Sequence, residues 1–172
     1  MSAVPESYWQ IISPLIVKAR EFLEEGATLT PIAFVGSFSS GKIIPVILQA
    51  ATDEAKDNSA LAIRTAAQSA DADFVFVLME AWSLRKDKLP QVEKIMERYG
   101  SIGASPYAID VVSMALETRH GLWMAQVPIK PKRYSKKNRT MGSPMFQHFA
   151  EYEGRFSNLL PKKDDEQPST LH

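Results

Sequence analysis

Hydrophobic residues are most concentrated between residues 72 and 82, in the run Ala-Asp-Phe-Val-Phe-Val-Leu-Met-Glu-Ala-Trp. Its length and its phenylalanine and valine content predict a strand buried on both faces, since such a run crosses a small domain once. Alternate residues of a strand share a face, which here carries Phe74, Phe76, Leu78, Glu80 and Trp82. The predicted strand therefore brings a carboxylate and an indole to the same place.

The N-terminal pattern predicts a helix over residues 5–25, followed by Gly26 as a C-terminal cap. Apolar side chains recur at spacings of three and four residues, at Tyr8, Ile12, Leu15, Ile16, Ala19, Phe22 and Leu23. Pro14 leaves two versions open. Either the helix kinks there, or Ser13 caps a shorter helix with Pro14 at its first position.

Two short apolar runs, residues 30–35 and 43–48, flank the serine- and glycine-rich segment 36–42. Both runs are rich in β-branched residues, so the pattern predicts a hairpin with its turn at 36–42. Pro45 then belongs to an edge strand, because proline has no N–H to give to a strand ladder.

Two further helices are predicted. Thr52 or Asp53 caps the first, which runs to about Ser69, and Pro90 opens a shorter helix that ends at Gly100. The shorter helix carries Val92, Ile95, Met96 and Tyr99 on one face.

Residues 110–118 and 122–129 predict a second hairpin, in which Gly121 supplies the positive φ of the turn. For 109–118 a helix stays open as the alternative, because Ser105-Pro106 is also a favourable helix start.

The last part of the chain becomes polar. We expect an exposed basic segment at 130–143, a short helix within 145–160 and a disordered tail at 161–172. Together the elements predict one α+β domain over residues 1–160, with about five strands in a mixed or antiparallel sheet and the helices packed on one face.

Composition narrows the class of protein. The chain is 45% hydrophobic and 23% charged, as ordinary globular proteins are, and it contains no cysteine, which excludes disulfides, thiolate metal ligands and a cysteine nucleophile. No run reaches the roughly 18 apolar residues of a membrane span, and none resembles a signal peptide. We therefore expect a cytoplasmic protein that does not enter a membrane.

The segment Gly36-Ser-Phe-Ser-Ser-Gly41-Lys42 follows the predicted strand. It resembles the phosphate-binding loop of nucleoside triphosphatases, and Phe-Val-Gly-x-x-x-Ser-Gly-Lys is similar to the version in dynamin-like GTPases. The resemblance implies a nucleotide-binding hydrolase in which Gly36, Gly41 and Lys42 surround phosphates. Ile43 stands where the magnesium-binding hydroxyl is expected, and Pro45 stands in the first turn of the expected helix. A simple turn between two strands explains the same residues.

Acidic and aromatic residues gather at the predicted strand ends: Glu80, Trp82, Glu117, Arg119, His120 and Trp123. If these strands are neighbours, Glu80, Glu117 and His120 are candidates for acid–base catalysis. The spacings that place metal ligands locally are missing, so we expect no metal and no cofactor. The structural alternative places His120 in a turn and pairs Glu80 with a lysine or arginine.

Positive charge is unevenly distributed. The chain has 20 basic and 20 acidic residues, yet six cations fall within residues 130–139, namely Lys130, Lys132, Arg133, Lys136, Lys137 and Arg139. Cations at this density neutralise phosphates, and Tyr134 among them offers a ring on which a base stacks, so the segment is a nucleic-acid-binding candidate. The alternative is a solvated loop, or one that meets the acidic residues 164–166 of its own or another copy.

An apolar strand ending in Glu-Ala-Trp, followed by a short segment and a hairpin, resembles small α+β proteins encoded in bacterial and phage genomes. The function we predict is a non-enzymatic interaction protein of a bacterial or phage accessory system, with a protein partner or self-association. A nucleic-acid-associated protein and a nucleotide hydrolase are the alternatives.

Overall fold

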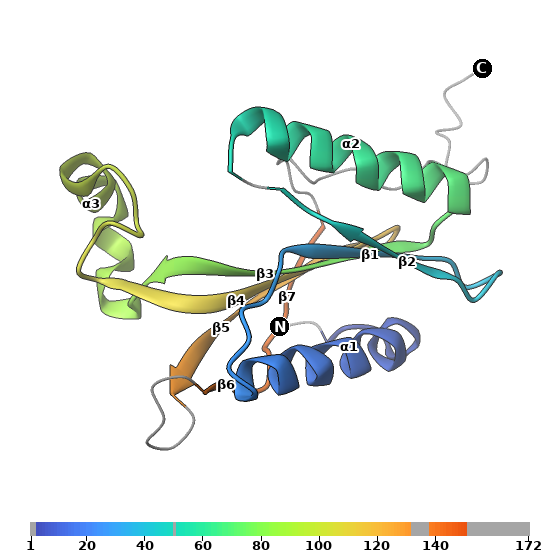
Figure 1. Ribbon diagram of the computed structural model, residues 1–172, viewed down its shortest axis with the longest axis horizontal. Helices are drawn as coiled ribbons and strands as arrows, with labels where there is room; N and C mark the ends of the chain where they lie inside the picture. The colour runs from blue at the N-terminus through green and yellow to red at the C-terminus, as the bar shows by residue number, and fades with distance from the viewer. Residues whose placement is uncertain (1–2, 50, 132–137, 151–172) are drawn as a thin grey trace. The chain divides into compact units, whose positions relative to one another are not determined.

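The computed structural model describes residues 3–49, 51–131 and 138–150. These residues form helices and a sheet (Figure 1). The helices are α1 (Glu6–Glu24), α2 (Asp53–Ala70), the 3₁₀-helix η1 (Lys86–Gln91) and α3 (Val92–Tyr99). The strands are β1 (Ile32–Gly36), β2 (Ile43–Ile47), β3 (Phe74–Leu84), β4 (Ala108–Thr118), β5 (Gly121–Pro131), β6 (Arg139–Met141) and β7 (Gln147–Phe149). The sheet has the order β2-β1-β3-β4-β5-β6, and β7 pairs with β5.

Contacts within the chain define two compact units. The described residues of the first unit are 3–30, 78–114, 124–131 and 138–147. Those of the second unit are 31–49, 51–77, 115–123 and 148–150. Each unit therefore combines segments that are far apart in the sequence. None of the described helices has both the length and the apolar character that crossing a bilayer requires.

In the second unit, α2 packs along the hairpin of β1 and β2 (Figure 1). The hairpin is antiparallel, as predicted, and Phe34 pairs with Pro45 in its middle. Thr52 caps α2 by accepting a hydrogen bond from the N–H of Ala55 at 3.0 Å. The helix buries mainly small side chains, and Ser59 exchanges hydrogen bonds with the backbone of Gln49 at 2.8 and 3.1 Å. Small residues let the helix lie close to the strands.

Gly36, the last residue of β1, leaves room for the ring of Phe74 at the start of β3. A Cβ atom added to Gly36 would lie 2.1 Å from the Cζ atom of Phe74. Because Phe74 is fully buried, its ring has little space into which to move. Packing alone therefore requires a glycine at position 36.

In the first unit, α1 continues through Pro14, so Ser13 is not the cap of a shorter helix. The helix contacts β6. Arg20 donates hydrogen bonds to the carbonyls of Met141 and Gly142 at 2.9 and 3.2 Å, and the Thr140 hydroxyl donates one to Glu24 at 2.8 Å. The two bonds from Arg20 satisfy backbone carbonyls at the end of the very short strand β6, and all three bonds attach that strand to the helix.

The predicted hairpin of β4 and β5 is present, so the helix alternative for 109–118 is wrong. A two-residue turn, Arg119-His120, joins the strands, and Gly121 follows with φ +124°. The Thr118 hydroxyl donates to the carbonyl of Gly121 at 3.1 Å and accepts from the N–H of His120 at 2.9 Å. The left-handed backbone at position 121 is the reason that a glycine is needed there.

The α+β class is confirmed, but the described residues form a sheet of seven strands rather than about five. The exposed basic segment at 130–143 stays a prediction; at its described ends, β5 extends to Pro131 and β6 begins at Arg139. Within 145–160, the described part contains strand β7 instead of a helix. Neither β6 nor β7 has an apolar run from which it could be predicted. Both strands form by backbone pairing with β5.

Three further predictions about the fold are untested. Residues 151–160 and the tail 161–172 lie outside the described residues. A single domain over residues 1–160, and the packing of the long helices on one face of the sheet, stay predictions.

Replacing Gly36 with alanine tests the contact with Phe74. We expect Gly36→Ala to lower the free energy of unfolding by about 1–3 kcal/mol, the usual cost of an overpacked core. Gly142→Ala is the control, because a Cβ atom at that position meets nothing within 4 Å. Urea denaturation of both variants is the measurement, and equal stabilities would contradict this account of Gly36.

Candidate functional site

The segment that resembles a phosphate-binding loop is the turn between β1 and β2. Ser37 and Lys42 close it, with the N–H of Ser37 donating to the carbonyl of Lys42 at 3.0 Å. Gly41 has φ +69°, which favours glycine, and Lys42 is exposed. The residues that follow form strand β2, whereas the resemblance implies a helix there. Both glycines thus have structural explanations, Gly36 through Phe74 and Gly41 through its backbone angle.

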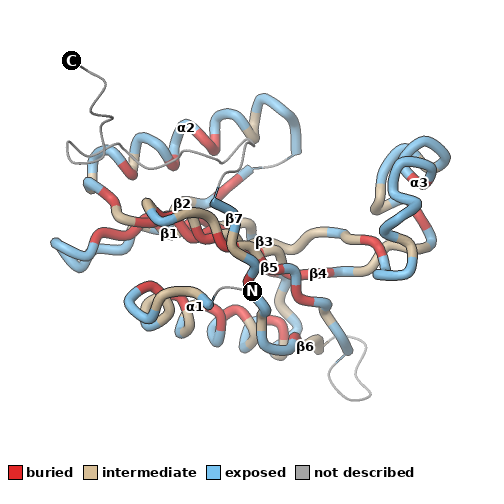
Figure 2. Tube along the Cα trace, turned by 180° about the vertical axis from the view of Figure 1, so that it is seen from behind, coloured by how far each residue is buried: buried red, intermediate tan, exposed pale blue. Residues whose placement is uncertain are grey.

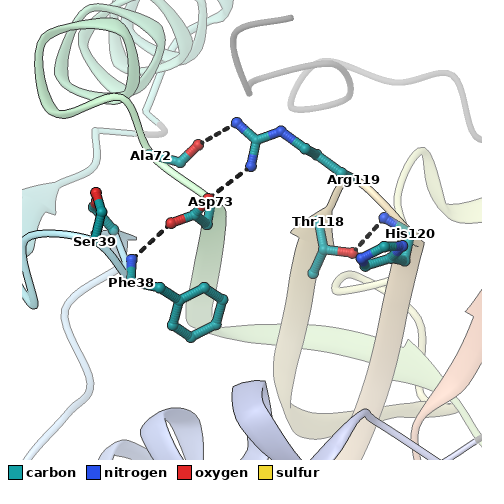
Figure 3. Close-up of polar contacts among 8 residues, drawn as sticks. Phe38, Ser39, Ala72, Asp73, Thr118, Arg119 and His120 are labelled. Atoms are coloured by element: carbon teal, nitrogen blue, oxygen red, sulfur yellow. Dashed lines mark hydrogen bonds and ion pairs between the residues drawn. The ribbon is translucent and has the colours of Figure 1, made fainter. Parts of the chain in front are cut away.

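A carboxylate already occupies this turn (Figure 3). Asp73 accepts hydrogen bonds from the N–H of Phe38 at 2.6 Å and from Nη1 of Arg119 at 2.9 Å, and Nη2 of Arg119 donates to the carbonyl of Ala72 at 2.9 Å. A backbone N–H bound to a carboxylate is not offered to a phosphate, and the negative charge of Asp73 repels one. This geometry favours a structural turn, held to β3 by an ion pair.

Glu80 is held by two strong hydrogen bonds within the first unit. Its Oε1 accepts from Nη1 of Arg139 at 2.7 Å, and its Oε2 accepts from the N–H of Leu29 at 2.7 Å. Arg139 also donates to the carbonyl of Ala27 at 3.3 Å. The carboxylate therefore links β3, β6 and the segment that follows α1. Such a bridge is typical of a structural residue, because a general acid or base must be able to reach a substrate.

The predicted rim residues are divided between the two units. Glu80 and Trp82 belong to the first, whereas Glu117, Arg119, His120 and Trp123 belong to the second. The roles of Glu80, Glu117 and His120 in acid–base catalysis stay predictions. Among the residues that the structure describes, no three His, Cys, Asp or Glu side chains are grouped so as to hold a metal ion.

His148 of β7, which the sequence pattern did not single out, contacts two of these rim residues. Its ring stacks on Trp123 with the centroids 4.3 Å apart, and its Nε2 lies 3.0 Å from the carbonyl of His120. A carbonyl only accepts, so Nε2 carries the proton. A Cβ atom on Gly121 would lie 2.3 Å from this nitrogen. The imidazole that contacts the indole of Trp123 is therefore that of His148. Nothing in the sequence around His148 indicates this contact except that the residue is a histidine.

The basic segment is attached at its two ends. Lys130 is exposed in β5 and pairs with Thr140, and Pro131 pairs with Arg139. Arg139 is engaged by Glu80, so its charge is partly neutralised. The remaining nucleic-acid candidates, Lys132, Arg133, Tyr134, Lys136 and Lys137, lie outside the described residues.

The clearest unexplained surface is the 82–107 segment, which comprises the end of β3, η1, α3 and the loop to β4. Trp82 is 64% exposed although it rests against the backbone at Gly103. Of the apolar residues predicted on one face of α3, only Ile95 is buried, and α3 is almost entirely pale blue in Figure 2. Exposed large side chains of η1 and α3 recur at spacings of three and four residues, at Leu89, Val92 and Met96.

Cations flank these apolar residues. The Nζ atom of Lys88 lies 4.6 Å from the ring centroid of Tyr107, and Arg85 donates to both oxygens of Asp87 at 3.2 and 2.9 Å. The hydrogen bonds from Arg85 hold the pKa of the exposed Asp87 carboxyl below its ordinary value. The 82–107 segment contains five cations and three anions. Its surface is thus apolar with a basic margin.

Comparisons with protein-family models, with curated proteins and with solved structures find no match.

The part-buried pair of Asp73 and Arg119 is a testable element of the second unit. We expect Arg119→Ala to lower the free energy of unfolding by about 3 kcal/mol, because it leaves a largely buried carboxylate without its arginine. The matched control is Arg85→Ala, whose ion pair is exposed and should contribute much less to the free energy of unfolding. The side chains are 12% and 17% exposed in the first pair, against 51% and 61% in the second. If urea denaturation gave equal losses in the free energy of unfolding for the two variants, the stabilising role of the Asp73–Arg119 pair would be contradicted.

Proposed function

We propose that this chain is a non-enzymatic interaction protein that binds a protein partner through the 82–107 segment. The observation that carries the proposal is the exposure of Trp82 together with Leu89, Val92 and Met96. Exposed apolar groups of this size are characteristic of recognition surfaces, and tryptophan is among the residues most enriched at the centres of protein interfaces.

Local structure supports the proposal. Helix α3 has apolar residues on one face but buries only Ile95, so Val92 and Met96 contribute little to the packing of the fold. An amphipathic helix with an unburied apolar face is the form that many protein grooves bind. The exposed residues lie on regular helical turns and at the end of a strand, which hold them in place before any partner arrives.

Charge supports a particular kind of partner. Within the described residues, Lys86, Lys88 and Lys94 form no ion pair, and the ion pair of the segment is Arg85 with Asp87. Positive charge around an apolar centre is complementary to a groove with acidic margins. The partner we propose is therefore a protein whose apolar groove is bounded by carboxylates.

The carboxylates at the candidate sites also support a role without catalysis. Asp73 accepts from Arg119 and from a backbone N–H, and Glu80 accepts from Arg139 and from a backbone N–H. Both carboxylates are part of the fold, whereas the fold does not account for the exposed apolar residues of the 82–107 segment.

A photo-crosslinking amino acid at Met96, introduced in the cells that encode the chain, tests the proposal. We expect an adduct of a single mass with a different protein. Leu89→Ser should lower its yield about tenfold, a loss of about 1.4 kcal/mol in binding. Leu61→Ser in α2 is the matched control, because Leu61 is 60% exposed and belongs to the other unit. Wild-type circular dichroism and melting temperature are required of both variants.

Three outcomes would contradict the proposal. One is the absence of an adduct, and another is an equal loss of yield in both variants. The third is binding of the purified protein to anionic vesicles or to itself that Leu89→Ser abolishes, since this would assign the surface to a membrane or to a second copy.

A second candidate function is association with nucleic acid through the basic segment. The pairing of Pro131 with Arg139 supports it, because it brings together the two ends of a stretch that contains four cations and Tyr134. Cations close in sequence to an aromatic ring are suited to binding a phosphate backbone and to stacking on an unpaired base.

Fluorescence anisotropy with a labelled single-stranded oligonucleotide tests this candidate. We expect binding that weakens with salt, with a slope of log K against log [salt] of about −0.7 for each phosphate contact. Serine at Lys132, Arg133, Lys136 and Lys137 should reduce both the affinity and the slope. Serine at Lys86, Lys88, Lys94 and Arg98 removes the same charge and should affect binding less. Salt-independent binding, or equal losses, would exclude the basic segment as the site.

A further inference from the structure

We propose that Pro45 prevents the exposed edge of β2 from pairing with the same edge of a second copy of the chain. Strand β2 is the first strand in the order of the described sheet, so one of its sides has no neighbouring strand there. Edges of this kind are templates for pairing with another chain, and proline is one of the residues that block them. The inference does not depend on the proposed function.

The hydrogen bonds at the ends of the hairpin fix which backbone groups of β2 point outward. Ser37 donates to the carbonyl of Lys42, and Leu48 donates to the carbonyl of Pro31. In an antiparallel pair, residues that exchange hydrogen bonds alternate with residues that do not. Counting from either end gives the same result: Ile43, Pro45 and Ile47 belong to the non-exchanging pairs. Their backbone groups therefore point away from β1.

The outward residues would form an edge able to pair with another strand if each of them had a backbone N–H to donate. Ile43 and Ile47 each offer an N–H and a carbonyl, and their side chains are 42% and 61% exposed on the same face of the hairpin. Pro45 lies between them and offers only a carbonyl. One donor is missing at the centre of an otherwise apolar and open edge.

Two-fold symmetry makes this one missing donor decisive. A copy related by a two-fold axis through residue 45 would place Pro45 opposite itself and Ile43 opposite Ile47. The central pair would then form no hydrogen bond where two are expected. Sliding the copy by two residues in either direction places Pro45 opposite Ile43 or Ile47, and each such pair loses one bond. Every symmetric register that uses more than one outward residue is therefore weakened.

Sedimentation velocity of Pro45→Val tests the inference. Valine restores the donor and suits a strand, and the inward hydrogen bonds of β2 come from other residues, so the fold should be kept. We expect self-association at least about tenfold tighter than that of the wild type. Adding Ile47→Lys should reverse it, because a charged side chain at an edge discourages pairing. Pro144→Val, the same change outside any strand, should have no effect.

Hydrogen exchange identifies the surface involved. In the associated variant the N–H groups of residues 43, 45 and 47 should become protected, whereas those of α2 should be unchanged. If valine at position 45 lowers solubility, Pro45→Thr restores the same donor with a polar side chain and must give the same result. Association no tighter than in the wild type in both variants, or association that Ile47→Lys does not reverse, would overturn the inference.

Discussion

A carboxylate that is largely shielded from water needs a positive charge beside it, and two such carboxylates lie on or next to β3. Asp73, just before the strand, is paired with Arg119 from the turn between β4 and β5. Glu80, near its other end, is paired with Arg139 at the start of β6. In each unit an arginine from a later segment is thus attached to β3, and a backbone N–H completes the carboxylate's hydrogen bonds. The apolar residues at the centre of β3 are buried, and each ion pair attaches a later segment of the chain to this strand.

The ion pair of Asp73 helps to explain why the turn after β1 resembles a phosphate-binding loop although its geometry favours a structural turn. The serine- and glycine-rich turn after β1 has glycines where a phosphate-binding loop has them, yet Gly36 accommodates Phe74 and Gly41 has a left-handed backbone. The N–H of Phe38 is directed at Asp73. A carboxylate and a phosphate use the same donors, so a turn stabilised by the first can have the composition of a turn that binds the second.

The edge of β2 and the 82–107 segment are both exposed and apolar, but they differ in how open they are to other chains. The edge of β2 is apolar but lacks a donor at Pro45, which limits what can be added to the sheet there. The 82–107 segment has Trp82 and Met96 exposed on a strand and a helix, with lysines nearby in the sequence. Preventing one kind of contact while exposing another is how a small protein remains specific.

The sequence by itself determined the elements whose signals are local. Periodic apolar spacing placed α1 and α2, Thr52 marked a cap, and Gly121 marked the turn between β4 and β5. The β1–β2 hairpin and the edge position of Pro45 followed in the same way, because strand alternation and the missing N–H of proline act within a few residues.

Only the tertiary structure decided the rest. The strands β6 and β7 owe their existence to pairing with β5, and the partners of Asp73 and Glu80 lie 46 and 59 residues away in the chain. The apolar spacing of α3 is the same as that of a helix that packs on a core. Only the structure shows that Ile95 alone of these residues is buried and that Val92 and Met96 are exposed. Burial and ion pairing depend on which distant segments meet, and that information is absent from any local pattern.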